Sequence, residues 1–94
     1  MEYIDVQWRH KNVNYPLRLV SELDDQRNEV RKLEFFPSGL VGFASTSGSA
    51  HGTELGEAPV PPLSQINNDP QFAGIAIDSA AFEALWSHYA ANAT

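Results

Sequence analysis

The first half of the chain is divided into short apolar segments by turn signals, and this division limits the fold more than any other feature. Apolar and polar residues alternate from Tyr3 to Lys11, which is the period of a strand with one buried face. Pro37 fixes φ near its turn value, and Gly39 accepts the positive φ that a short hairpin turn requires. The predicted strands cover about residues 3–11, 16–23, 29–36 and 40–44. Short loops between consecutive strands predict a four-stranded antiparallel meander.

The second half begins with a long segment of small and turn-forming residues. Residues 45–62 are rich in Ser, Gly, Thr and Pro, and they predict an irregular connection that exceeds the usual loop length of about 4 to 6 residues. Residues 63–68 can form one helical turn, which Pro70 would end because the residue before a proline avoids the helical region. Residues 72–77 are too short and mixed to assign to a strand or a helix.

The last predicted element is an amphipathic helix over about residues 79–91. Asp78 is a good N-cap, and apolar side chains then repeat at the spacing of one helical face. This face consists of Phe82, Leu85, Trp86 and Tyr89. Its burial predicts that the helix packs on the sheet, with Trp86 and Trp8 as core partners between the two layers. A chain of 94 residues suffices for one hydrophobic core, so residues 1–94 are expected to form a single α+β domain.

Charge is distributed unevenly along the chain. The net charge is −6, yet all six Lys and Arg residues lie in the first 32 positions, where six acids offset them. The six later acids therefore carry the whole imbalance. Such a field disfavours binding to nucleic acid and to anionic membranes, and it favours a basic protein partner, because the summed charge steers association at long range.

Two absences in the sequence point to the cytoplasm. The chain has no cysteine, which fits a reducing compartment. No apolar run approaches the roughly 18 residues of a membrane span, and the opening MEYID lacks the basic-then-apolar order of a signal peptide. We therefore expect a cytoplasmic protein without a membrane partner.

Six segments of the sequence carry a resemblance to known proteins, namely YIDVQW at 3–8, SELD at 21–24, EVRK at 29–32, GTELG at 52–56, PVPPL at 59–63 and FEALW at 82–86. Together they resemble a family of small, uncharacterised bacterial proteins of about this length. The resemblance implies a role as an immunity protein beside a contact-dependent or secreted toxin. It offers no active-site motif to carry over to this chain.

No motif in the sequence points to catalysis, a cofactor or a metal. His10, His51 and His88 are too far apart for the i, i+3 or i, i+4 spacing of metal ligands on a helix. Residues 47–49, Ser-Gly-Ser, lack the Gly-x-Ser-x-Gly elbow of a serine nucleophile. Three glycines spaced by four residues lack the Gly-Lys-Ser/Thr ending of a phosphate-binding loop. We therefore expect a protein that is not an enzyme and holds no cofactor.

The basic residues of the predicted strands have two interpretations. One is a stripe for RNA, with Trp8 and Tyr3 as stacking platforms. The stripe would consist of Arg9, Arg18, Arg31 and Lys32. The other interpretation is a set of cross-strand ion pairs. The acids available for such pairs are Asp5, Glu22, Glu29 and Glu34. This balance favours ion pairs, and we expect no nucleic-acid partner.

The acids of the irregular connection and of an earlier hairpin loop are the predicted partner-binding residues. Glu54 and Glu57 stand near Gly and Pro, where they can enter a cationic cleft of the kind that nucleases need to hold phosphate. Asp24 and Asp25 complete the set, although their simplest role is to hydrogen-bond the local backbone of the hairpin loop. The alternative interpretation of Glu54 and Glu57 is a solvated surface loop.

Two functions of different classes remain as hypotheses. The leading one is a bacterial immunity or antidote protein that binds a basic toxin, such as a nuclease, through its acidic loop and C-terminal region. The alternative is a structural or regulatory module that forms homo-oligomers through an exposed strand edge or the open face of the sheet, because an antiparallel meander leaves edges that must be protected or paired. Small size, the missing catalytic motif, the one-sided acidity and the family resemblance favour the first.

Overall fold

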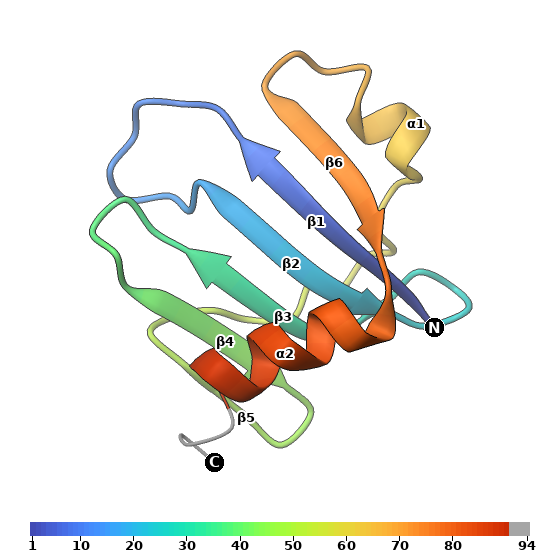
Figure 1. Ribbon diagram of the computed structural model, residues 1–94. Coiled ribbons are helices and arrows are strands. Elements are labelled where there is room, and N and C mark those ends of the chain that lie inside the picture. The colour runs from blue at the N-terminus through green and yellow to red at the C-terminus, as the bar shows by residue number, and fades with distance from the viewer. Residues whose placement is uncertain (91–94) are drawn as a thin grey trace.

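The computed structural model describes residues 1–90, which form a six-stranded antiparallel sheet and two helices (Figure 1). The strands are β1 (Glu2–Trp8), β2 (Arg18–Leu23), β3 (Glu29–Phe35), β4 (Val41–Ser45), β5 (Gly48–Ala50) and β6 (Phe72–Ile77). The helices are α1 (Leu63–Ile66) and α2 (Ser79–Tyr89). The predicted α+β class, with an antiparallel sheet and a C-terminal helix, is confirmed. Neither helix of residues 1–90 is long and apolar enough to cross a membrane.

The prediction of four strands is wrong, because the sheet gains one strand at each edge. The strand order is β5-β4-β3-β2-β1-β6, so the predicted meander is extended by β5, and β6 returns to pair with β1 at the far edge. The strand β5 lies inside the segment expected to be irregular, which leaves residues 51–62 as the irregular part. The sequence does not predict β6, because its Ala and Gly residues are small and give no clear alternation of apolar and polar side chains.

The boundaries of β1 and β2 also differ from the prediction, since β1 ends at residue 8 and β2 begins at residue 18. The ring of His10 organises the chain between them. One ring nitrogen accepts the N–H of Asn12 at 3.0 Å, and the other donates to the C=O of Pro16 at 2.8 Å. These bonds turn the segment into a loop.

The predicted helix end at residue 91 lies outside the described residues.

The helix α2 lies across one face of the sheet, as predicted (Figure 1). Its start is capped by Asp78, whose Oδ1 accepts the N–H of Ala81 at 2.8 Å. The buried side chains between the helix and the strands are Val20, Leu33, Phe43 and Phe82. This cluster forms the larger of two cores.

The second core lies on the opposite face of the sheet. Side chains alternate along a strand, so Tyr3 meets the ring of Phe82 at 5.3 Å between centroids while Ile4 points to the other face. That face is covered by α1 and by the chain that leads to it. The side chains of this core are Ile4, Val6 and Leu23, packed against Val60, Leu63, Ile66 and Phe72. The sheet is therefore covered on both faces.

The predicted contact between the two tryptophans is wrong. Trp86 packs on Phe43, with 5.8 Å between ring centroids, in the core beneath α2. Trp8 stacks on Tyr15 and on Phe72, each at 5.7 Å. The physical reason is strand periodicity, because Trp8 shares the side of β1 that faces away from the helix.

The chain between β5 and α1, residues 51–62, is called the crossover here, and it passes behind the sheet in Figure 1. Thr53 is fully buried on it. A Cβ atom on Gly42 of β4 would lie 2.0 Å from Thr53 Oγ1, so the crossover approaches the sheet as closely as only glycine permits. The Arg27 guanidinium holds it further along by donating to two of its carbonyls at 2.8 Å.

Candidate functional site

Among the predicted partner-binding residues, Asp24 has a structural role in the loop between β2 and β3. Its Oδ1 accepts the backbone N–H of Asn28 and that of Gln26, both at 2.9 Å. These bonds, with that from Asn28 foremost, hold the pKa of Asp24 below its usual range. The expected bonding to local backbone is thus confirmed for Asp24. The neighbouring Asp25 is exposed.

Glu54 and Glu57 are exposed on the crossover, each beside an anchored residue. Thr53 precedes Glu54 and is buried against β4. Gly56 precedes Glu57, and its N–H donates to Glu29 Oε1 on β3. The backbone that carries the two free carboxylates is therefore fixed to the sheet.

The hairpin loop and the crossover, which are far apart in sequence, lie against each other. Arg27 of the loop donates to the C=O of Val60 and to that of Pro61, and its own C=O accepts the N–H of Val60 at 2.8 Å. The structure therefore brings the two predicted acidic segments together. Their exposed carboxylates, Asp25, Glu54 and Glu57, are called the acidic surface here.

Most basic side chains are neutralised by ion pairs. Four of the six Lys and Arg residues form one, with N–O distances of 2.6 to 3.0 Å. The pairs are Arg18–Asp5, Arg27–Glu2, Arg31–Glu22 and Lys32–Glu29. The predicted cross-strand pairing is confirmed for Asp5 and Glu22. Glu29 pairs within its own strand instead, and Glu34 has no ion pair among residues 1–90.

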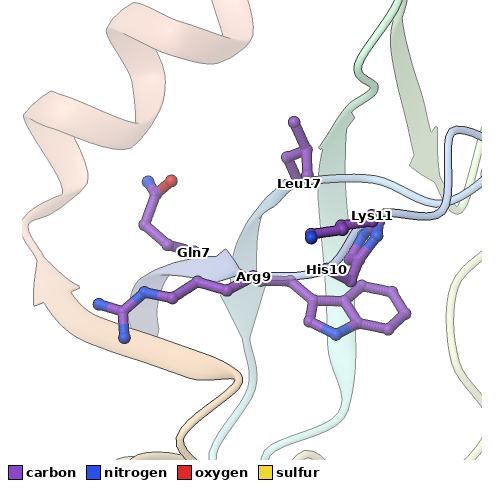
Figure 2. A pocket seen from close by; sticks show the side chains of 6 residues that line it. Gln7, Arg9, His10, Lys11 and Leu17 are labelled. Carbon is purple, nitrogen blue, oxygen red and sulfur yellow. The ribbon is translucent and has the colours of Figure 1, made fainter.

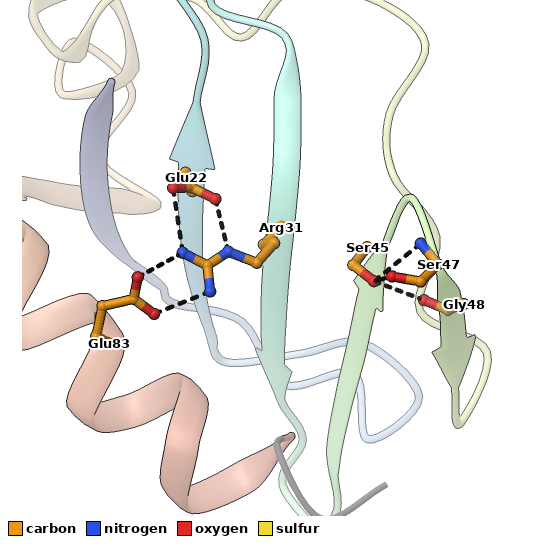
Figure 3. A network of polar contacts seen from close by, with 6 residues as sticks. All are labelled: Glu22, Arg31, Ser45, Ser47, Gly48 and Glu83. Carbon is orange, nitrogen blue, oxygen red and sulfur yellow. Dashed lines mark hydrogen bonds and ion pairs between the residues drawn. The ribbon is translucent and has the colours of Figure 1, made fainter. Parts of the chain in front are cut away.

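Arg31 joins the sheet to α2 (Figure 3). Its guanidinium donates to Glu22 at 2.6 Å and to Glu83 of the helix at 2.9 Å. It also lies over the rings of Phe82 and Trp86, at 4.8 and 5.1 Å from their centroids. The hydrogen bond from Arg31 lowers the pKa of Glu83. The donors of Arg31 are thus occupied within the fold, and the residue is a structural clamp.

Figure 3 also shows the turn that joins β4 to β5. Ser45 Oγ accepts the N–H of Ser47 at 3.2 Å and donates to the C=O of Gly48 at 3.4 Å. These serine hydroxyls stabilise the turn. Across residues 1–90, no three His, Asp or Glu side chains gather in a way that could hold a metal ion.

A site that sequence analysis missed lies where β1 ends. An open hollow of about 650 Å³, called the β1 hollow here, is lined by five consecutive residues at the end of β1 and by one residue just before β2 (Figure 2). They are Gln7, Trp8, Arg9, His10, Lys11 and Leu17. Arg9 and Lys11 are exposed, and they are the two cations that have no ion pair in the described part of the chain. One signal could have revealed them, since the sequence contains no Asp or Glu between Asp5 and Glu22.

Comparisons with known proteins give one result. Neither a curated protein nor a solved structure matches the chain. A family model described as a domain of unknown function (DUF6881) matches residues 2–91. The match agrees with the expected resemblance to a small family of chains of this length. The chain therefore belongs to the family of the domain of unknown function DUF6881.

Proposed function

We propose that this domain binds a basic protein partner without catalysing a reaction, and that it is a bacterial immunity or antidote protein that neutralises a cognate toxin in the cytoplasm. The observation that carries the proposal is the acidic surface. Its carboxylates form no ion pair within residues 1–90, and the cations nearest to them along the chain, Arg27 and Lys32, are already paired. A basic ligand therefore meets negative charge without a competing internal partner.

The anchored backbone beneath the acidic surface favours tight binding. Ordering a mobile segment at an interface costs conformational entropy, and a segment that is already held avoids most of that cost. The crossover is held by Thr53, by the bond from Gly56 to Glu29, and by Arg27. It can present Glu54 and Glu57 to a partner with little rearrangement.

The expected partner is a protein with a positive cleft. Enzymes that cut nucleic acid need positive charge to hold phosphate, and exposed carboxylates can occupy the same cleft. The net charge of −6 steers such a partner at long range, so association is expected to be fast at low salt and slower at high salt. A nuclease toxin fits this chemistry, and the family resemblance favours an immunity role.

A charge-reversal experiment tests the proposal. Tagged wild-type protein and the double variant Glu54→Lys with Glu57→Lys are used to capture partners at low and at physiological salt. We expect the wild type to retain one basic polypeptide that is toxic when expressed alone and harmless when co-expressed with this domain. The double variant should lose both capture and protection, because two attractions become two repulsions.

Two further variants serve as controls for this experiment. Glu54→Gln with Glu57→Gln removes the charges without reversing them, so it should weaken capture less than the Lys variant. Lys11→Glu changes a charge at the β1 hollow and should not weaken capture. Full protection by the Lys variant, or recovery of nothing but the bait, would rule out the acidic surface as the toxin-binding site.

Self-association is the second candidate function, and one observation favours it. Ile75 on the edge strand β6 is 61% exposed. Exposed apolar side chains on an edge strand are suited to pairing with another copy. Light scattering over a concentration series separates the two candidates, because a strict monomer at every concentration excludes this one.

A further inference from the structure

The β1 hollow differs chemically from the rest of this acidic molecule. Arg9 and Lys11 lie on its wall, and no acid within residues 1–90 pairs with either of them. Arg9 uses one weak bond, at 3.4 Å, to the C=O of Pro70, which leaves most of its five donors free. The hollow is therefore a local concentration of positive charge on a chain with a net charge of −6.

The loop that forms the hollow is held in place by hydrogen bonds and ring contacts. One ring nitrogen of His10 accepts from the N–H of Asn12, and the other donates to the C=O of Pro16. Trp8 is held at its indole N–H by Gln71 Oε1 at 3.2 Å. Tyr15 stacks on the indole with an interplanar angle of 20°. A ligand would meet a preformed surface and would not need to order a mobile loop.

Large apolar side chains are exposed on the same loop. Val13 is 73% exposed and Tyr15 is 52% exposed, and Leu17 at the wall of the hollow is 38% exposed. The three side chains are spaced by two positions in this loop, and apolar side chains that are exposed together are typical of an interaction site. Tyrosine and arginine beside apolar side chains are the composition typical of the energetically important centre of protein interfaces.

We infer that the β1 hollow docks an acidic peptide segment of a partner protein, in which a carboxylate stands next to a large apolar side chain. Arg9 and Lys11 bind the carboxylate, and Leu17 with the outer face of Tyr15 packs against the apolar side chain. The hollow of about 650 Å³ has the size of sites that hold a few side chains. Charge complementarity selects an acidic occupant.

Nucleic acid fits the hollow less well than an acidic peptide. Tyr15 and Phe72 both stack on Trp8, each with 5.7 Å between ring centroids, so the indole already has two aromatic partners with which a base would have to compete. A nucleic-acid site also needs a track of several free cations along the phosphates. The other four cations of this chain are held in ion pairs.

The docking site is independent of the acidic surface. The strand β1 runs from Glu2, which pairs with Arg27 of the β2–β3 loop, to Trp8 at the hollow. Seven strand residues span about 20 Å. The β2–β3 loop and the hollow therefore lie at opposite ends of β1, and none of the residues that line the hollow belongs to the acidic surface.

A peptide-display experiment tests the inference. A library of random linear peptides is selected on the immobilised full chain and counter-selected on the variant Arg9→Glu with Lys11→Glu. Enriched peptides should carry Asp or Glu beside Trp, Phe or Leu. The best peptide and its Asn/Gln counterpart are then titrated by calorimetry, and we expect affinity to fall by about tenfold or more in the Glu variant and with the Asn/Gln peptide.

Matched variants and a site-specific signal complete the test. Arg9→Lys with Lys11→Arg keeps both charges and should retain binding, and Glu54→Lys with Glu57→Lys should leave peptide affinity nearly unchanged even if it abolishes toxin capture. In an NMR titration, the indole N–H signal of Trp8 should shift while that of Trp86 stays in place. Enrichment of basic or uncharged peptides, equal affinity for the Glu variant, a silent Trp8 signal, or preferential binding of oligo-dT would each overturn the inference.

Discussion

At the residue scale, buried and half-buried polar groups in this protein are almost all matched. Asp24 accepts two backbone N–H groups, and Arg31 donates two bonds to the buried Glu22 and two to the exposed Glu83. Thr53 is the exception, because its buried Oγ1 has no hydrogen-bond partner among the described residues. Two predictions follow from these groups, one on pH and one on stability.

The lowered pKa values of Asp24 and Glu83 predict acid sensitivity. A carboxyl whose pKa is lower in the folded chain stabilises the fold fully above its unfolded pKa, and this stabilisation is lost as the pH falls through the folded pKa. We expect the free energy of unfolding, measured with urea, to decline between about pH 6 and pH 2. In Asp24→Asn the amide oxygen still accepts both N–H groups but does not titrate. Its stability should converge with that of the wild type at acid pH, and parallel curves would contradict the assignment.

The unmatched hydroxyl of Thr53 predicts a stabilising substitution. Thr53→Val keeps the branched shape and removes a buried polar atom that forms no bond, which should stabilise the fold by about 1 kcal/mol and raise Tm by about 4 to 8 °C. Thr53→Ser is the matched control, since it keeps the hydroxyl and loses a methyl group that is worth about 0.8 kcal/mol. Thermal unfolding of the three chains should rank them Val, Thr, Ser. A Tm for the Val variant below that of the wild type would show that the hydroxyl is hydrogen-bonded in solution.

At the element scale, the edges of the sheet are protected in two ways. The strand β5 has three residues, which offers little to pair with. On β6, the side chain of Asn67 bonds to the backbone of Gly74 as a neighbouring strand would. Its Oδ1 accepts the N–H of Gly74 at 2.7 Å, and its Nδ2 donates to the C=O of Gly74 at 3.0 Å. The residue that closes this edge is thus the C-cap of the short helix α1.

Removal of the Asn67 side chain should open the edge of β6. Asn67→Ala loses two hydrogen bonds, which should cost about 1 to 2 kcal/mol of folding free energy, and it exposes both polar groups of Gly74. We expect this variant to self-associate more than the wild type in a concentration series by light scattering. Asn68→Ala changes the adjacent residue, whose side chain caps nothing on β6, and should behave as the wild type. Equal mass for all three chains would mean that the Asn67 cap is not what keeps β6 from pairing.

At the scale of the whole molecule, one sheet supports two cores and two surfaces of opposite charge. The chain crosses from β5 to β6 behind the sheet and returns over the front as α2 (Figure 1). Each core therefore rests on the same central strands. A substitution that loosens the core on one face should therefore also destabilise the core on the other face, because both cores rest on the shared strands.

The two tryptophans can test this coupling, because Trp8 reports on one end of the rear core and Trp86 on the front core. Leu63→Ala truncates the rear core and should destabilise the chain by about 2 kcal/mol. Urea unfolding is followed by fluorescence in the backgrounds Trp8→Phe and Trp86→Phe. We expect the truncation to shift the midpoint by the same amount in both, as one cooperative transition requires. A shift seen only with Trp8 as the probe would mean that the two faces unfold separately.

Local patterns in the sequence determined the central strands, the turn at Gly39 with its φ of 91°, and the capped helix α2, because alternation, turn residues and N-caps act between near neighbours. Sequence analysis also found the acidic residues of the two loops. Only the tertiary structure decided that β6 pairs with β1 and that the crossover joins the hairpin loop. It also decided that, within residues 1–90, Arg9 and Lys11 form no ion pair while the other Lys and Arg residues do. These outcomes depend on which residues face each other across the sheet. A pairing between residues about 70 positions apart in the chain is set by the packing of whole elements, which no short stretch of sequence records.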